Sequence, residues 1–248
     1  MMADKTMQFS DKGYIIKVLK HGETSAIVTV LSSQYGKITG FVKGGLSKKK
    51  LGVYQLGNLI SFNAYARLEE NMPQFLGVEL LKANAVNFFN CQKKLALLSS
   101  FCELMNISAV ENESLDFLSS HINQFMDSKT FEKMLVAYSF FEFYLLKFLG
   151  IGLDLSECAA TGTSQNLEFV SPKSSKAVCY EAGLPYKDKL FKFPHYVVDK
   201  NYTPKLSEVA DLLKMTEFFL NKNFFENHGL KFPNNRGNLL NILNLPKE

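Results

Sequence analysis

The spacing of apolar residues changes once along this chain of 248 residues, near Cys91, and that change most limits the folds open to it. Before this point, short runs rich in β-branched residues alternate with turn residues, which is typical of strands. After it, apolar residues recur every three or four positions, which is typical of helices. The sequence therefore predicts a multidomain α+β protein, with a strand-rich domain at residues 1–82 and an α-helical domain at residues 83–248.

Short β-branched runs predict five strands in the first domain. These strands cover residues 14–19, 26–31, 37–42, 58–67 and 74–80. Turn residues separate the first three strands, and residues 69–73 form a turn before the fifth. Five short strands within about 75 residues suit a small closed barrel, for which the OB-fold is the commonest choice. We expect an OB-fold here, although an SH3-like barrel fits the strand count nearly as well.

Apolar stripes predict the helices of the second domain. They cover about residues 95–105, 115–125, 130–149, 204–218 and 235–243. Gly150 stands where a C′ glycine would end the clearest helix, and Thr203 and Pro204 suit the N-cap and N1 positions of a later one. Residues 151–200 show few periodic runs, so we expect a loop-rich insert within the helical domain.

Positive charge is concentrated in the first domain. Residues 1–82 contain 11 Lys and Arg against 6 Asp and Glu, a net charge of +5, whereas the other residues contain 17 against 18, a net charge of −1. A local basic excess is the pattern expected of a surface that meets a polyanion. The predicted barrel is therefore the candidate nucleic-acid-binding domain.

A basic loop directly follows the third predicted strand. Its sequence, Lys43-Gly-Gly-Leu-Ser-Lys-Lys-Lys50, places four lysines in eight residues. The two glycines let backbone N–H groups approach a phosphate closely. We predict that the loop contacts DNA phosphates through Lys43, Lys48, Lys49 and Lys50. The alternative is a solvated loop that only keeps the barrel soluble.

Other side chains of the first domain could extend this basic surface. The additional cations are Lys17, Lys20, Lys37 and Arg67. Tyr35, Tyr54 and Tyr65 could offer ring faces for stacking on bases, the usual partner of a basic groove in single-strand binding. Each tyrosine also suits a core or edge position of the barrel.

Signals for catalysis, membrane insertion and secretion are missing from the sequence. None of the four histidines has metal-ligand spacing to another, and no zinc-protease, nucleophile-elbow or dinucleotide-binding motif occurs. No apolar run reaches the length of about 18–20 residues that a membrane span needs. The first ten residues contain no apolar core of a signal peptide, and four cysteines are too few for a disulfide scaffold. We therefore expect a cytoplasmic protein that is not an enzyme.

Two cysteines of the insert stand in similar surroundings. Cys158-Ala-Ala-Thr-Gly162 and Cys179-Tyr-Glu-Ala-Gly183 look like two zinc knuckles whose second cysteines are replaced by Thr161 and Ala182. Two thiolates cannot complete the tetrahedral site of structural zinc, and although His195 could be a third ligand, nothing marks a fourth. The sequence therefore predicts a degenerate, zinc-knuckle-like insert with no metal and no cofactor.

Two sets of short motifs carry a family resemblance. The first is Gly13-Tyr-Ile-Ile-Lys-Val-Leu19, Gly22-Glu-Thr-Ser25, Ile27-Val-Thr-Val-Leu31, Tyr35-Gly-Lys37 and Val42-Lys-Gly-Gly45. The second is Leu149-Gly-Ile-Gly-Leu-Asp-Leu155, Cys158-Ala, Phe169-Val-Ser-Pro-Lys173 and Ala177-Val-Cys179. In this order they resemble the RecO family of recombination mediators, whose first domain is an OB-fold ending in a basic loop. Many members carry four cysteines and zinc at the insert; this chain resembles the branch without the metal.

The resemblance implies a function in DNA repair and recombination. It implies binding of single- and double-stranded DNA, annealing of complementary strands and, together with RecR, loading of RecA onto single strands coated with single-stranded-DNA-binding protein (SSB). It also implies a nucleoid-associated location in the cytoplasm. A generic OB-fold module that binds RNA or single strands, or a scaffold that binds protein, remains an alternative.

The acidic-hydrophobic tail of SSB is a further partner that the resemblance implies. This tail ends in acidic residues, a bulky apolar residue and a carboxylate, so its receptor needs an apolar pocket rimmed by cations. We expect the pocket in the helical domain and name Arg236 as its candidate cation, because a guanidinium grips a carboxylate with two parallel hydrogen bonds. The alternative is that Arg236 caps or staples the last helix.

Overall fold

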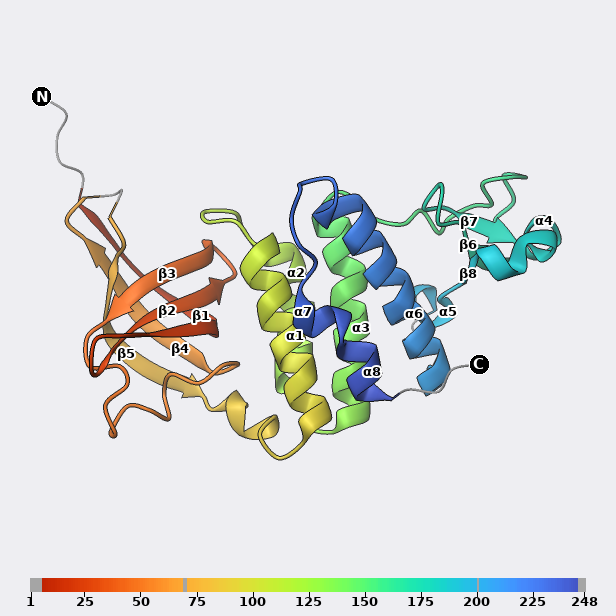
Figure 1. Ribbon diagram of the computed structural model, residues 1–248. Helices are drawn as coiled ribbons and strands as arrows, with labels where there is room; N and C mark the ends of the chain where they lie inside the picture. Colours follow the sequence, from red (N-terminus) through yellow and green to blue (C-terminus); the bar gives the residue numbers. More distant parts are fainter. Residues whose placement is uncertain (1–5, 69–70, 200, 245–248) are drawn as a thin grey trace, which may run out of the picture. The chain divides into compact units, whose positions relative to one another are not determined.

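The computed structural model describes residues 6–68, 71–199 and 201–244, which form two compact units (Figure 1). The units divide between Lys129 and Thr130. The strand-rich segment ends at Lys82, but residues 84–127 belong to the same compact unit as the strands. Residues 69 and 70 of the predicted turn lie outside the described residues.

Five strands form the barrel of the first unit, as the sequence predicts. They are β1 (Met7–His21), β2 (Ser25–Ser32), β3 (Gly36–Val42), β4 (Leu59–Ala66) and β5 (Gln74–Lys82). They close in the order β1-β2-β3-β5-β4. The first half of β1 pairs with β4 and its second half with β2, with a change of register between Ile15 and Lys17. This long strand starts well before the predicted one. The prediction missed its first part because residues 7–13 are mostly polar and carry no β-branched run.

Alternate side chains of these strands point into the barrel. Ile15, Val28, Val30 and Ile60 are fully buried there. At Gly40, a Cβ atom would lie 2.3 Å from the ring of Phe75, so only glycine leaves room for this ring inside the barrel. Phe75 and the aliphatic side chains thus fill the interior, which leaves the outer face to bind ligands.

Two helices, α1 (Gln92–Ser108) and α2 (Asp116–Asp127), complete the first unit after a short 3₁₀ turn, η1 (Asn84–Asn87). The turn between β2 and β3 hydrogen-bonds the segment between the helices: the N–H of Asn112 donates to the carbonyl of Tyr35 over 3.0 Å, and that of Leu115 to Ser33 over 2.7 Å. These bonds explain why the barrel and both helices form one compact unit.

The second unit is built on two long helices, α3 (Phe131–Phe148) and α6 (Leu206–Phe219). Thr130 caps α3, since its side chain accepts from the N–H of Lys133, and Gly150 follows the helix with φ +74°. Helix α6 begins two residues after Pro204. It continues as a π-helical segment, η3 (Leu220–Phe225), and the predicted last helix is two short ones, α7 (Asn234–Gly237) and α8 (Leu239–Leu243).

The insert between α3 and α6 contains a small sheet where the sequence predicted irregular structure. Its strands, in the order β7-β6-β8, are β6 (Leu167–Val170), β7 (Ala177–Cys179) and β8 (Phe191–Lys192). Its helical segments are α4 (Tyr180–Gly183), η2 (Leu184–Lys189) and α5 (His195–Val198). These strands are too short to show an alternating pattern. No helix in the described part of the chain is long and apolar enough to cross a membrane.

Candidate nucleic-acid interface

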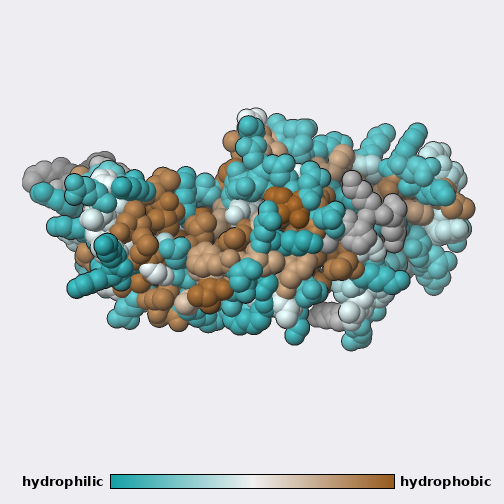
Figure 2. Space-filling view, turned by 60° about the horizontal axis from the view of Figure 1, so that its bottom comes forward, coloured by the Kyte–Doolittle hydropathy of each residue, from teal (hydrophilic) through white to brown (hydrophobic). Residues whose placement is uncertain are grey.

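The outer face of the barrel carries an apolar row that crosses three strands. Leu19 of β1 pairs with Ile27 of β2, which pairs with Phe41 of β3. Paired residues of neighbouring strands lie on the same face of a sheet. Leu19 is 47% exposed, whereas Ile27 and Phe41 are partly exposed. Figure 2 shows apolar side chains that reach the surface of the barrel among polar ones.

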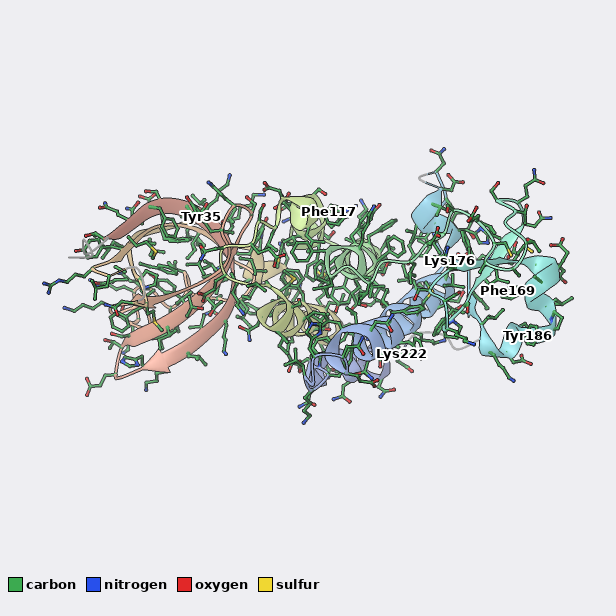
Figure 3. The ribbon with its side chains drawn as sticks, turned by 90° about the horizontal axis from the view of Figure 1, so that it is seen from above. Tyr35, Phe117, Phe169, Lys176, Tyr186 and Lys222 are labelled. Atoms are coloured by element: carbon green, nitrogen blue, oxygen red, sulfur yellow. The ribbon has the colours of Figure 1, made fainter. Side chains whose placement is uncertain are left out.

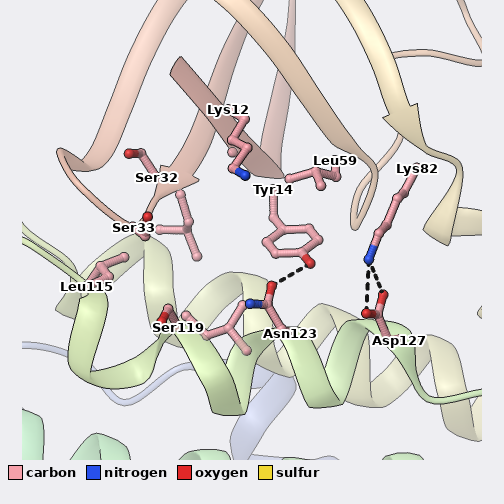
Figure 4. A pocket seen from close by; sticks show the side chains of 13 residues that line it. Lys12, Tyr14, Ser32, Ser33, Leu59, Lys82, Leu115, Ser119, Asn123 and Asp127 are labelled. Carbon is pink, nitrogen blue, oxygen red and sulfur yellow. Dashed lines mark hydrogen bonds and ion pairs between the residues drawn. The ribbon is translucent and has the colours of Figure 1, made fainter.

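Helix α2 covers the other end of this outer face. Tyr14 of β1, which pairs with Leu31, donates from its hydroxyl to Oδ1 of Asn123 over 2.7 Å (Figure 4). A cavity of about 410 Å³ beside this contact is lined by residues of the barrel and of α2. Burial and the negative charge of Asp127 raise the pKa of Tyr14 to about 12, so its hydroxyl stays protonated and donates at neutral pH. Helix α2 therefore covers the Tyr14 end of this face, whereas Leu19 and His21 at its other end are exposed.

Two loops border the open end. The rings of His21 and Phe41 meet edge to face, with centroids 5.6 Å apart. The N–H of Phe41 donates to the carbonyl of Pro73 over 2.8 Å, which brings the β4–β5 connection to the same place. OB-folds bind oligonucleotides on their second and third strands, between the loops that follow β1 and β4. The partly exposed ring of Phe41 and the exposed ring of His21 thus occupy the position where bases stack in this fold.

The rings of Phe41 and His21 form a platform for stacking. The predicted basic loop lies beside this platform and is anchored at both ends. The N–H of Leu46 donates to the carbonyl of Thr24 over 2.7 Å, which attaches the start of the loop to the β1–β2 turn. Val53 and Leu56 pack against the barrel core. Because both ends are anchored, the exposed tip, Lys48 to Lys50, projects from a fixed base.

Most of the predicted DNA-binding cations are exposed. They are Lys17, Lys20, Lys43, Lys48, Lys49, Lys50 and Arg67. Lys17 pairs with Thr29 one row away from Phe41, so its side chain lies on the outer face itself. Lys37 differs: it is half-buried, and its ammonium donates to the carbonyl of Asn106 over 2.9 Å. The structure therefore gives Lys37 a role in attaching α1 to the barrel, and its predicted phosphate contact is not supported.

The tyrosines proposed for stacking do not form the platform. Tyr54 is 4% exposed and belongs to the barrel core, which corrects that prediction. Tyr35 packs on Phe9 with centroids 4.6 Å apart, and only Tyr65 is well exposed, on β4. The sequence analysis missed Phe41 and His21. The alternation of residues 37–42 places Phe41 on one face of the strand and Ile38 and Gly40 on the other, but it does not indicate which of these faces is the outer face of the barrel.

Arg236 is fully buried in the second unit, so the prediction that it binds the SSB tail is wrong. Its guanidinium donates to both carboxylate oxygens of Glu142 on α3 and to Glu217 on α6 over 2.7 Å. It also donates to the carbonyl of Leu213. The alternative prediction, that Arg236 caps or staples the last helix, is closer to the structure, because Arg236 joins α7 to two long helices.

A different surface of the second unit offers the features expected of a tail receptor. A cavity of about 550 Å³ is lined by Lys214, Glu217, Phe218, Asn221, Lys222, Glu226, Phe232 and Leu240. Lys222, marked in Figure 3, lies with its ammonium 5.2 Å from the ring centre of Phe218. One acidic residue of this lining, Glu217, is already paired with Arg236. The cavity thus combines aromatic and aliphatic walls with two lysines, of which Lys214 also pairs with Asp211, and with a second carboxylate, Glu226.

The described residues hold no group of three or more His, Cys, Asp or Glu side chains arranged to bind a metal ion. His195, the third ligand considered above, contacts Glu168 with 3.4 Å between nitrogen and oxygen and is exposed. The chemistry of this ligand set does not fit structural zinc, which needs four N or S donors.

Comparison with known proteins agrees with the geometry of the barrel. The family model for the N-terminal domain of recombination protein O matches residues 7–84, and that for its C-terminal domain matches residues 92–231. The chain is 35% identical to DNA repair protein RecO of Bartonella quintana over 239 residues, 95% of this chain and 97% of the relative. It is 34% identical to those of Mesorhizobium japonicum, covering 96% and 94%, and Rickettsia canadensis, covering 90% and 91%.

Proposed function

The chain belongs to the RecO family of DNA repair proteins, and from this premise we propose that it is a non-enzymatic recombination mediator. It binds single- and double-stranded DNA and anneals complementary strands. Together with RecR it helps to load RecA onto SSB-coated single strands. Family membership supports the part played by RecR and RecA, and the surface of the barrel supports the binding of DNA.

The observation that carries the proposal is the open outer face of the barrel. Phe41 and His21 present rings there, and Lys17 and the tip Lys48–Lys50 supply positive charge at the same unit. Stacking on rings and attraction of phosphates to cations together bind single strands without reading their sequence. This combination suits a protein that must accept any broken DNA.

Annealing requires no bond chemistry from such a surface. Two single strands repel each other through their phosphates, and a cationic surface reduces that repulsion so that complementary bases can pair. Binding releases counterions from the DNA, so the affinity falls as the salt concentration rises. A mediator of this kind therefore needs exposed lysines rather than catalytic side chains.

The cavity between Phe218 and Lys222 is the proposed receptor for the SSB tail. An apolar side chain at the end of the tail would enter between Phe218, Phe232 and Leu240, and Lys214 and Lys222 would face the acidic residues. This assignment keeps the tail in the helical part of the chain, as the sequence analysis expected, but replaces Arg236 as its cation.

A salt titration combined with an annealing assay tests the proposed function. The full chain should bind a fluorescent single strand at low salt, with affinity that falls steeply as salt rises. It should also speed the pairing of complementary strands coated with SSB. Tight binding to RNA without annealing of SSB-coated DNA would instead indicate a generic single-strand-binding module, and negligible binding of any nucleic acid at low salt would indicate a protein-binding scaffold.

A further inference from the structure

The insert holds two buried cysteines in one small cluster, although its described residues do not supply the four ligands of a structural zinc site. Cys158 and Cys179 are each 2% exposed and form a small apolar cluster with Val178. The N–H of Cys179 donates to Sγ of Cys158 over 3.2 Å. The sulfur of Cys158 therefore lies against the backbone of Cys179. Figure 3 marks Phe169, which packs on this cluster.

One hydroxyl connects the two sulfurs. Oγ1 of Thr161 lies 3.6 Å from Sγ of Cys179 and also hydrogen-bonds the sulfur of Cys158. A hydroxyl has a single hydrogen to donate. When it donates to Cys158, it must accept from the S–H of Cys179, so the arrangement suits one thiolate and one thiol. Thr161 stands where a zinc knuckle would have its second cysteine.

Cys158 is the sulfur that the surroundings hold as a thiolate. Burial acts to raise its pKa, but hydrogen bonds from the Thr161 hydroxyl and from three backbone N–H groups outweigh burial and lower the pKa to about 6. The donors belong to Cys179, Ala160 and Thr161. Gly162, at φ +72°, closes the turn that supplies two of them, and its N–H donates to the carbonyl of Cys158 over 2.8 Å. These donors therefore favour the thiolate form of Cys158.

We propose that Cys158 and Cys179 are a redox site that forms a reversible disulfide when the insert meets a hydroperoxide. The thiolate of Cys158 attacks one peroxide oxygen, so that an S–O bond forms, the O–O bond breaks and the departing oxygen takes a proton to leave as alcohol or water. The sulfur of Cys179 then attacks the sulfenic acid; the S–S bond forms, and hydroxide leaves with the proton of Cys179 as water. Two thiols lose two electrons, and the peroxide gains them.

Both cysteines are buried, but the turn that follows Cys158 lies at the surface. Residues 159–162, the turn over the sulfur of Cys158, are all exposed, and a hydroperoxide is a small oxidant. The other two cysteines provide internal controls. Cys102 is buried in the middle of α1, and this burial raises its pKa. Cys91 is partly exposed at the start of the same helix.

Peptide mapping of the full chain tests the proposal directly. The reduced protein is treated with increasing hydrogen peroxide, free thiols are blocked with N-ethylmaleimide, and the digest is analysed by mass spectrometry. A linked Cys158–Cys179 peptide should appear before Cys102 is oxidised and should disappear on treatment with dithiothreitol. If both sulfurs are still fully alkylated at a dose that oxidises Cys91, the proposal is overturned.

Two sets of variants separate the chemistry from the folding of the insert. In Cys179→Ser the sulfenic acid of Cys158 should accumulate and react with dimedone, because its partner thiol is gone. Thr161→Ala should slow alkylation of Cys158 at pH 6 several-fold, whereas Thr161→Ser, which keeps the hydroxyl, should not. Equal alkylation rates in the two Thr161 variants would show that the hydroxyl does not hold the thiolate and would contradict the proposed arrangement. These measurements do not depend on DNA binding, so they can fail independently of the proposed function.

Discussion

Arg236 and Glu142 form a buried ion pair in which the guanidinium donates to both carboxylate oxygens. Both side chains are fully shielded from solvent, although 94 residues separate them in the sequence. Thr216 of α6 donates to the same carboxylate. The pair therefore ties α3, α6 and α7 together at one point. Such a pair is costly to break, since the remaining partner becomes an uncompensated buried charge.

Replacing Arg236 by Met should destabilise the protein strongly. The substitution leaves Glu142 buried without its cation, for which the expected loss in free energy of unfolding is about 3–5 kcal/mol. Denaturant unfolding of the variant measures this loss. Lys82→Met is the matched control, because it removes a cation from the exposed pair with Asp127 and should cost less than about 1 kcal/mol. Equal losses in the two variants would contradict the role given to Arg236.

Arg236 also shows where sequence reasoning stops. A lone arginine near the end of the chain is a reasonable ligand for a carboxylate, and it does bind one, but the carboxylate belongs to Glu142. The sequence indicates that an arginine can bind a carboxylate, but it does not indicate which carboxylate. The partner is set by the packing of α7 against α3 and α6, which no local pattern encodes.

The barrel was more predictable because its signals are local. Strand alternation and turn residues indicated all five strands of the barrel, and only the polar first half of β1 escaped, since its pairing with β4 is a long-range property. The same limit applies to the platform. Tyr54 and Phe41 are both aromatic and both lie within three residues of a glycine, yet one fills the core and the other faces outward. Which face is outer depends on the strand partners.

Replacing Lys48, Lys49 and Lys50 together by Ala should weaken DNA binding for every sequence. For every lysine that no longer neutralises a phosphate, the slope of log affinity against log salt should fall by roughly 0.7–0.9. A salt titration of a fluorescent single strand measures both quantities. The exposed cations Lys187 and Lys189 of the insert, replaced by Ala, serve as the control. Unchanged affinity and slope in the triple variant would mean that the loop is merely solvated.

Phe41→Ala should weaken single-strand binding without changing its salt slope. Stacking on one aromatic side chain is worth about 1–3 kcal/mol per base, which corresponds to roughly a 5- to 150-fold loss of affinity. The slope should persist because no cation is removed. Tyr65→Ala, at an exposed aromatic residue on β4, is the matched control and should bind as the parent does. A larger loss at Tyr65 than at Phe41 would place the bound strand on the other side of the barrel.

Purified protein should contain well under one zinc ion per chain. Cys158 and Cys179 offer two sulfurs, and the four donors of a structural zinc site are not completed by His195, which contacts Glu168. Elemental analysis before and after treatment with a chelator measures the metal. A stoichiometric zinc that resists the chelator would contradict this prediction and would also require a new account of the insert.

The cavity beside α6 should bind the acidic, apolar tail of SSB through Phe218 and Lys222. Phe218→Ala removes an apolar wall, and Lys222→Glu replaces a cation by an anion, so each should weaken binding of a fluorescent tail peptide to the full chain by about tenfold or more, a change of about 1.4 kcal/mol. The effect of Lys222→Glu should shrink at high salt, because exposed charges are screened, whereas that of Phe218→Ala should persist. Lys133→Glu, at an exposed position of α3, controls for the change in net charge. If the peptide binds all three variants equally but loses affinity when the lysines of the basic loop are replaced, the tail is bound by the barrel instead.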